Sequence, residues 1–142
     1  MDTKRLVIGT LIGGITLYVT GYLIFELAFG AFYAANAGSA TGVVRTPELQ
    51  WAIAVASLSY AALVSLAIGN RSGSTTLAVG AKVGAVVGFL VWFTADFTLY
   101  GITNIQNLTR TTVDPLLEIV HGGVAGAIIA AALKSIAPSQ GR

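Results

Sequence analysis

The chain contains no cysteine and very little charge. Without cysteine it can form neither disulfides nor thiolate metal sites, and thiol catalysis is excluded. Charged residues make up only 10% of the sequence, whereas a soluble domain usually carries about a quarter. Because so few charges cannot cover the surface of a soluble domain of this length, the composition excludes that class.

Familiar catalytic and nucleic-acid-binding patterns are also missing. No glycine-rich phosphate loop follows a strand, no G-x-S-x-G pattern occurs, and the chain has a single histidine. The eight basic residues give a net charge of +2 but are dispersed along the chain. A nucleic-acid partner is therefore not expected, no cofactor is indicated, and the sequence gives no support for an enzymatic activity.

What the chain does contain is long apolar segments. Hydrophobic residues make up 55% of the sequence and the mean hydropathy is +0.80. About 20 apolar residues are enough to cross a hydrocarbon core of roughly 30 Å. Four segments reach that length, at residues 6–29, 49–69, 75–100 and 113–136. We therefore predict an all-α polytopic membrane protein, a single domain over residues 1–142 that forms a four-transmembrane-helix bundle in the lipid bilayer.

Turn and capping residues mark the ends of these segments. Thr46-Pro47-Glu48 and Asp114-Pro115 each combine an N-cap residue with a proline at the first helical position, and Ser74 is a third candidate cap. Gly69-Asn70 predicts a helix stop, and Lys134 fits the last turn of the fourth helix.

The N-terminal segment has a second interpretation. Lys4 and Arg5, the apolar run and Ala35-Asn36-Ala37 are similar to a signal peptide with its cleavage site. The run is longer than the apolar core of a signal peptide, and Glu26 interrupts its end. A retained first span is therefore the favoured interpretation.

The basic residues predict how the bundle is oriented. Six of the eight lie on the side of the two termini and the middle loop, if Lys82 extends back to that side, and two lie opposite. Because basic residues accumulate on the cytoplasmic side, both termini are expected in the cytoplasm. The loops 32–45 and 102–112 then face outwards.

Small residues recur at intervals of four in three of the spans. Such spacing places them on one stripe of a helix, where a missing side chain lets another helix approach closely. They predict helix packing within the bundle, or contact with a second copy or a larger membrane complex. The rows consist of Gly9 and Gly13; Gly80, Gly84 and Gly88; and Gly122, Gly126 and Ala130.

Ionisable residues gather towards the outward ends of the spans. Asp114, Glu118 and His121 share one helix stripe, because they are spaced by four and three. Glu26 follows Tyr18 and Tyr22 at intervals of four, and Asp96 lies between Trp92 and Tyr100 in the same way. If these stripes face inwards, a polar pocket lies in the outer leaflet. The candidate ligand- or proton-binding residues are Tyr22, Glu26, Asp96, Tyr100, Asp114, Glu118 and His121.

Three roles are open for this group. Glu118-x-x-His121 has the spacing of ligand pairs in di-iron bundles, so the two are candidate metal ligands, although only one such motif occurs. Carboxylate and histidine chains also serve as proton relays in membranes. The third interpretation is structural, with each group satisfied by a local hydrogen-bond partner.

The third and fourth spans carry a resemblance. Residues 88–98 read GFLVWFTADFT and are followed by Asn104, Asp114 and a small-residue run from Gly122. This pattern resembles a family of small bacterial four-span membrane proteins of unknown function, mainly over residues 84–133. The resemblance implies a bacterial inner-membrane protein. It assigns no activity, and it gives Glu118 and His121 no role.

Together these features lead to one expectation and one alternative. We expect a small integral inner-membrane protein that acts as a structural or accessory subunit or as a homo-oligomer, with a polar pocket near the outer face. The alternative is a transporter-like protein that binds a proton, a metal ion or a small ligand through Glu26, Asp96, Glu118 and His121.

Overall fold

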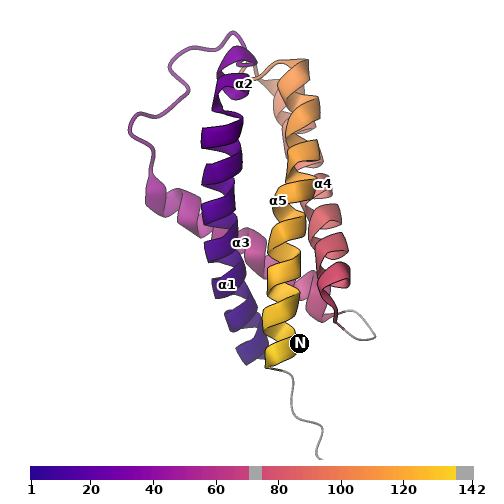
Figure 1. The fold of residues 1–142 in the computed structure, drawn as a ribbon. Coiled ribbons are helices and arrows are strands. Elements are labelled where there is room, and N and C mark those ends of the chain that lie inside the picture. Colours follow the sequence, from indigo (N-terminus) through magenta and orange to yellow (C-terminus); the bar gives the residue numbers. More distant parts are fainter. Residues whose placement is uncertain (71–74, 137–142) are drawn as a thin grey trace, which may run out of the picture.

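The computed structural model describes residues 1–70 and 75–136, which are mostly helical (Figure 1). Apart from an isolated bridge between Ala37 and Gln106, the described residues form no β-structure, so the all-α prediction is confirmed. The elements are α1 (Thr3–Gly21), the π-helix η1 (Tyr22–Ala28), α2 (Gly30–Ala35), α3 (Gln50–Gly69), α4 (Leu77–Ile102) and α5 (Leu108–Ser135).

Four of these helical stretches are long and apolar enough to cross a membrane. They are Thr3–Ala28, which joins α1 to η1, then α3, α4 and α5. The prediction of a four-helix bundle is confirmed, and the chain is a multi-pass membrane protein. The first three spans begin and end within a few residues of the expected positions. The fourth begins at Leu108 rather than at 113.

The early start of α5 corrects the predicted cap at Asp114-Pro115. Asn107 is the N-cap, and its side-chain oxygen accepts a hydrogen bond from the Arg110 amide at 2.9 Å. Pro115 lies inside the helix, where it removes one backbone donor. The helix nevertheless continues, because Asp114 and Pro115 lie on its buried face and are held there by tertiary packing.

Two of the other predicted helix ends also change. The predicted cap at Thr46 is wrong, since α3 begins at Gln50 without a side-chain cap. Ser74 lies outside the described residues, and Thr76 caps α4 by accepting from the Val79 amide at 3.2 Å.

The two predicted C-terminal signals are confirmed. Helix α3 stops at Gly69 with Asn70 as its C-cap, and Lys134 lies in the last turn of α5.

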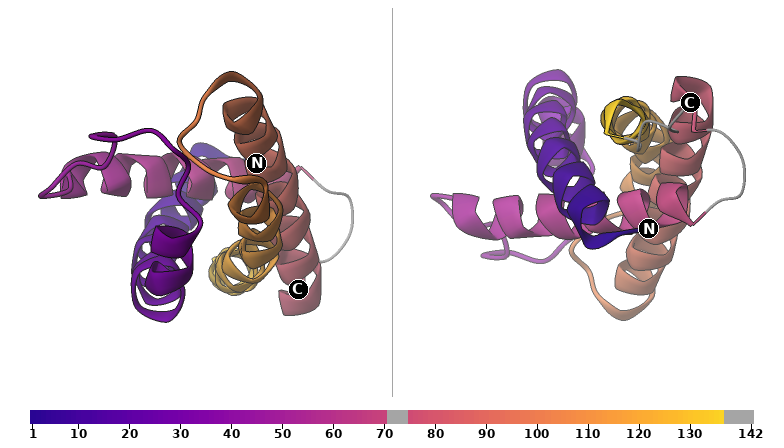
Figure 2. Two further views of the ribbon diagram at one scale, coloured as in Figure 1. Left: turned by 90° about the horizontal axis from the view of Figure 1, so that it is seen from above. Right: turned by 90° about the horizontal axis from the view of Figure 1, so that it is seen from below.

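The long helices do not all run parallel (Figure 1). Helices α4 and α5 lie side by side along most of their length, and α1 packs against α5 and α3. Helix α3 crosses the others obliquely, and its first half projects away from α4 and α5 when the bundle is viewed end-on (Figure 2). Trp51 and Val55 in this half are exposed. Helix α3 begins beside the last turn of α1, where the Tyr18 hydroxyl donates to the Gln50 side chain at 2.6 Å.

Each end of the bundle is fastened by contacts between distant segments. At one end, called here the termini end, an Arg5 guanidinium nitrogen donates to the Leu133 carbonyl at 3.4 Å, and Met1 lies against Gly69. At the other, called here the loop end, the Asn107 amide donates to the Asn36 carbonyl at 3.2 Å. The first and last described residues therefore lie at the same end, as an even number of crossings requires.

Helices α4 and α5 meet along a seam of glycines. Gly80 and Gly84 of α4 face the backbone of α5 at Gly122 and Gly126, and Gly88 faces the Glu118 carbonyl. A Cβ on Gly84 would collide with the Gly122 carbonyl oxygen, and one on Gly126 would lie 2.9 Å from the Gly84 Cα. The two backbones are therefore in direct contact, which only glycine allows. We call these five residues the glycine seam.

A second close approach brings α1 against α3 and α5. A Cβ on Gly13 would lie 3.0 Å from the Ala61 Cβ, and one on Gly9 would lie 3.2 Å from the Ser65 Cβ. Around these contacts, buried apolar side chains form a core in the termini half of the bundle: Val64, Ile68, Ile129, Ala130 and Leu133.

Candidate functional site: a buried polar chain

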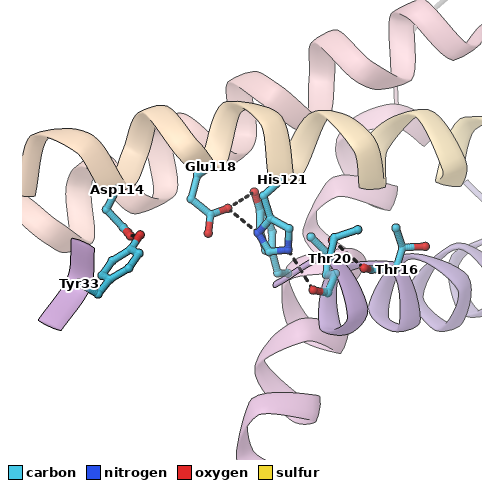
Figure 3. Close-up of polar contacts among 8 residues, drawn as sticks. Thr16, Thr20, Tyr33, Asp114, Glu118 and His121 are labelled. Carbon is cyan, nitrogen blue, oxygen red and sulfur yellow. Dashed lines mark hydrogen bonds and ion pairs between the residues drawn. The ribbon is translucent and has the colours of Figure 1, made fainter. Parts of the chain in front are cut away.

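The loop half of the bundle is built around polar side chains on one stripe of α5. Thr111, Asp114, Glu118 and His121 follow one another at intervals of three, four and three, and all four are buried. Figure 3 shows Asp114, Glu118 and His121 extending from the same face of α5 towards α1 and α2. A polar side chain in a membrane span is costly unless it finds a partner, so the partners of this stripe define the site.

The first cluster lies nearest the loop end. The buried Gln106 amide nitrogen donates to the Asp96 carboxyl oxygen Oδ1 at 3.2 Å and to the Thr111 hydroxyl at 3.1 Å. One loop residue thereby joins Asp96 of α4 to Thr111 of α5. Asp114 follows Thr111 by three residues on the same buried stripe.

Tyr33 of α2 points towards Asp114 (Figure 3). Its hydroxyl donates to Asp114, and the Arg110 guanidinium lies 4.7 Å from the centre of its ring. Burial raises the pKa of Tyr33 above its ordinary value, and the bond to Asp114 raises it further. The phenol therefore keeps its proton and acts as a donor to the carboxyl group.

The second cluster lies one helical turn further along α5. The Glu118 oxygen Oε2 lies 3.0 Å from the His121 nitrogen Nδ1 and accepts from the Tyr60 hydroxyl at 3.3 Å. The other imidazole nitrogen, Nε2, lies 3.0 Å from the Leu17 carbonyl oxygen. Side chains from α3 and α5 and the backbone of α1 therefore meet at one point.

In the geometry described, these contacts hold one proton in the Glu118–His121 pair. A carbonyl oxygen can only accept, so Nε2 of His121 carries a proton. If the imidazole is neutral, Nδ1 must accept and Glu118 must donate. If the imidazole is charged, Nδ1 donates to a carboxylate. In either state one proton lies between the two side chains, and the pair has no net charge.

The surroundings of His121 hold the imidazole in place. The Phe25 and Tyr60 rings meet it edge-on, with centroids 5.2 and 6.1 Å away, and Gly21 of α1 lies beside it, where a Cβ would be in ordinary contact at 3.5 Å. The α-helix gives way to the wider π-helix η1 immediately after Gly21, and π-helical turns are frequent at functional sites.

His121 lies deeper than the sequence predicted. It follows Leu108, the first residue of α5, by 13 positions (121 minus 108), which is about 20 Å at 1.5 Å per residue. It therefore lies near the middle of the helix rather than in an outer layer. The earlier helix start accounts for the difference.

Four of the predicted site residues come together and three do not. Asp96, Asp114, Glu118 and His121 are all buried in the two clusters. Tyr22, Glu26 and Tyr100 are exposed, so the expected convergence of Glu26 with Asp96 and Glu118 is wrong.

Tyr22 and Glu26 are exposed because they lie on the outward face of the first span. On α1 the buried residues are Gly9, Gly13, Gly14 and Leu17. Gly21 and Phe25 continue the row of Gly9, Gly13 and Leu17 towards His121. Tyr22 and Glu26 each follow that row by one position, a rotation of about 100° in an α-helix. Their side chains therefore point away from the bundle.

Four further members of the clusters were missed. Thr111 lies three positions before Asp114, so the spacing of the stripe could have identified it. Gln106 and Tyr33 lie in segments expected to be loops, and Tyr60 lies in a uniformly apolar span. For these three the sequence holds no signal, because they reach the site through contacts between distant segments.

The metal interpretation finds no support in the described part of the chain. Across residues 1–70 and 75–136, no group of three or more histidine, cysteine, aspartate or glutamate side chains is arranged to hold a metal ion. Glu118 and His121 remain a pair, and their second partners are a hydroxyl and a carbonyl that satisfy them as hydrogen-bonding groups.

Comparison of the chain with protein-family models, curated proteins and solved structures finds no match. The family resemblance seen in the sequence therefore stays an expectation. What the protein does has to be inferred from the geometry of the two clusters.

Proposed function

We propose that this protein is a small integral membrane subunit that binds a proton at the Glu118–His121 pair and exchanges it with the loop end of the bundle. The observation that carries the proposal is the pair itself, buried near mid-helix, with the Leu17 carbonyl holding one imidazole nitrogen and Glu118 facing the other. Carboxyl and imidazole groups placed in this way are typical of proton relays in membrane proteins.

The loop-end cluster offers a route to the pair. Asp114 lies four residues before Glu118 on the same stripe, so their Cβ atoms are about 5–6 Å apart. Tyr33 connects Asp114 to α2, and Gln106 connects Asp96 to Thr111 at that end. A proton that enters from the loop side thus meets exchangeable groups at each turn until it reaches His121.

The route stops at His121. The buried residues that follow on α5 are glycine, alanine, isoleucine and leucine: Gly122, Ala125, Gly126, Ile129, Ala130 and Leu133. None of them can accept or donate a proton through its side chain, and the glycine seam closes α4 against α5 along this stretch. The arrangement therefore favours one-sided proton binding over conduction through the bundle.

The orientation follows from the basic residues and the location from the family resemblance, and both remain part of the proposal. We infer a bacterial inner-membrane protein with both termini in the cytoplasm, so that the loop end, and with it the proton route, faces outwards. Reporter fusions at Arg142 and within residues 34–44 test this, and they should give opposite signals. Matching signals would contradict the four-span orientation.

The single histidine allows a direct test of the proton site. We would label the histidine with nitrogen-15, reconstitute the chain in lipid nanodiscs and record its imidazole spectrum against pH. Because His121 is the only histidine, every signal belongs to the site. The Nε2 proton should persist throughout, whereas the Nδ1 signal should change as the pair gains or loses its proton.

Two matched variants complete the experiment. Glu118→Gln keeps the shape but cannot exchange a proton with Nδ1, so the pH response should disappear or move. Glu26→Gln changes an exposed glutamate of α1 and should leave the spectrum unchanged. A wild-type signal that ignores pH, or the same response in Glu118→Gln, would show that the pair is a structural hydrogen bond.

A further inference from the structure

The segment that leads into α3 lies on the outside of the bundle. Residues 41–50 are all exposed, and of these only Gln50 belongs to a helix. Just before the segment, the Ala40 amide donates to the Asn104 carbonyl at 3.0 Å, which places its beginning at the loop end. Figure 1 shows the segment descending from there along the flank of the bundle to the start of α3. It is therefore an irregular, exposed stretch of chain beside the membrane spans.

A series of contacts places the last part of this segment at the middle of the bundle. The His121 imidazole contacts the Leu17 carbonyl, and the next residue of α1, Tyr18, donates to the Gln50 side chain. The Gln50 amide nitrogen in turn donates to the Glu48 carboxyl oxygen Oε2 at 3.3 Å. Glu48 therefore lies on the outer surface of the bundle, close to the depth of His121 near the middle of α5.

Lipid alone cannot cover such a surface. Hydrocarbon offers no hydrogen bonds to an irregular backbone, which occurs at membrane depth only where protein buries it or where it lines a water-filled cavity. A carboxylate at this depth is costly in lipid as well. A water-filled space on the flank of the bundle would itself need a second wall of protein. In either case the exposed segment borders another protein chain.

The face around this segment is complementary to itself. It carries opposite charges three positions apart, Arg45 and Glu48, and both residues are exposed. Val44 and Trp51 project from it, with 80% and 68% of their surface exposed. Beside them, a groove of about 350 Å³ lies between α1 and α3 and is lined by Tyr18 and apolar residues. A face with both charges, a projection and a hollow fits a second copy of itself in a two-fold arrangement, in which each contact occurs twice.

We propose that this face joins two copies of the chain. A two-fold axis along the membrane normal relates them, because both copies have the same orientation in the bilayer. Arg45 of each copy then pairs with Glu48 of the other, and Val44 and Trp51 pack at the contact. The three small-residue rows are already occupied within one bundle, so the interface uses a different surface. It goes beyond the proton-binding proposal and does not depend on it.

The first measurement is the oligomeric state of the full chain in lipid. Because the chain has no cysteine, Lys4→Cys provides a single labelling site at an exposed residue. Donor- and acceptor-labelled protein would be reconstituted together in liposomes at a high ratio of lipid to protein, and energy transfer would give the dissociation constant. Transfer that saturates as a dimer is expected. A monomeric chain would overturn the proposal and leave the face to a different membrane protein.

Charge reversal then tests which surface forms the contact. Arg45→Glu and Glu48→Arg should each raise the dissociation constant at least about tenfold, because like charges then face each other across the interface. An equal mixture of the two variants should dimerise again, since one copy carries two acids and the other two bases. Glu26→Arg reverses an exposed charge elsewhere on the first span and should leave the dissociation constant unchanged.

Two outcomes contradict the proposed pairing. Unweakened dimers in both single variants would place the contact on another surface, and a mixture that stays monomeric would exclude the two-fold pairing of Arg45 with Glu48. The double substitution of Arg45→Glu and Glu48→Arg in one chain also restores both pairs, which gives a second measurement if a single variant does not fold. The nitrogen-15 spectrum of His121 should be unchanged in Arg45→Glu, so this proposal and the proton-binding proposal fail independently of each other.

Discussion

The buried face of α5 has two halves that are held in opposite ways. From Thr111 to His121 it is polar. Its side chains form hydrogen bonds to Gln106, Tyr60 and the Leu17 carbonyl of other segments, and Glu118 contacts His121 within α5. From Gly122 to Leu133 it is small or apolar, and backbone lies against backbone along the glycine seam. One helix therefore carries a hydrogen-bonded half and a close-packed half.

The difference separates two requirements of a membrane protein. Close packing of small residues gives attraction between helices without a hydrophobic driving force. It also leaves no space for polar groups. The polar half gains exchangeable protons, and it requires that every donor and acceptor be satisfied. Substitutions in the two halves should therefore destabilise the bundle for different reasons.

The largest effect is expected in the close-packed half. Gly84→Leu should destabilise the bundle by about 3 kcal/mol or more, because the side chain would have to occupy the position of the Gly122 carbonyl. Thermal unfolding in detergent measures the loss. Gly101→Leu is the control, since a Cβ on Gly101 meets no atom within 4 Å. Equal stability of the two variants would show that the seam does not hold the helices together.

The second-largest effect is expected at Glu118, in the centre of the polar half. Glu118→Leu should cost about 2–3 kcal/mol, because it leaves the Tyr60 hydroxyl and the His121 nitrogen without a partner. Glu118→Gln retains a polar group of the same shape and should change the free energy of unfolding by less than about 1 kcal/mol. If the leucine variant were the more stable of the two, the polar contacts would not be holding this half together.

Two neighbouring glycines, Gly122 and Gly123, lie where the polar and the close-packed halves of α5 meet, and they allow a more specific comparison. A Cβ on Gly122 would lie 2.6 Å from the Tyr60 hydroxyl and would also collide with Gly84, whereas the nearest atom to one on Gly123 is 3.6 Å away. Gly122→Ala should therefore cost about 1–2 kcal/mol, and Gly123→Ala should be neutral or slightly stabilising. The unfolding midpoints of the two variants test this order of stability. If Gly123→Ala were the less stable variant, the close contact would involve the face of α5 that carries Gly123, not the face that carries Gly122.

The smallest effect is expected from a single hydroxyl. Tyr60→Phe removes the donor that lies 3.3 Å from Glu118 and should cost about 1 kcal/mol, the usual contribution of one hydrogen bond. Tyr100→Phe alters an exposed tyrosine and serves as the control. In the nitrogen-15 spectrum, Tyr60→Phe should also shift the pH response of His121. No change in either measurement would remove Tyr60 from the site.

Much of the fold could be predicted, because membrane spans depend on local composition. Four apolar segments of sufficient length are visible in the sequence, and the hydrocarbon core leaves a helix as the only way to satisfy their backbone groups. Helix starts were harder to predict. Asp114-Pro115 has the chemistry of a cap, but Asn107 takes that role, because tertiary contacts of the loop at 103–107 fix where α5 begins.

The candidate site was only half predictable for the same reason. The stripe of Asp114, Glu118 and His121 follows from spacing alone, and so does the face of α5 that they share. Which residues meet that stripe depends on how each helix is rotated. Glu26 had the same apparent signal as Asp96, yet it lies on the outward face of its helix and Asp96 is buried.

The sequence by itself determined the class of protein, the four spans and the alignment of acidic groups with His121 on α5, since all of these depend on composition and helical periodicity. Only the tertiary structure decided that Gln106, Tyr33 and Tyr60 complete the two clusters, and that α3 crosses obliquely. These features arise from contacts between segments far apart in the chain, and their energies depend on distances that local sequence does not encode.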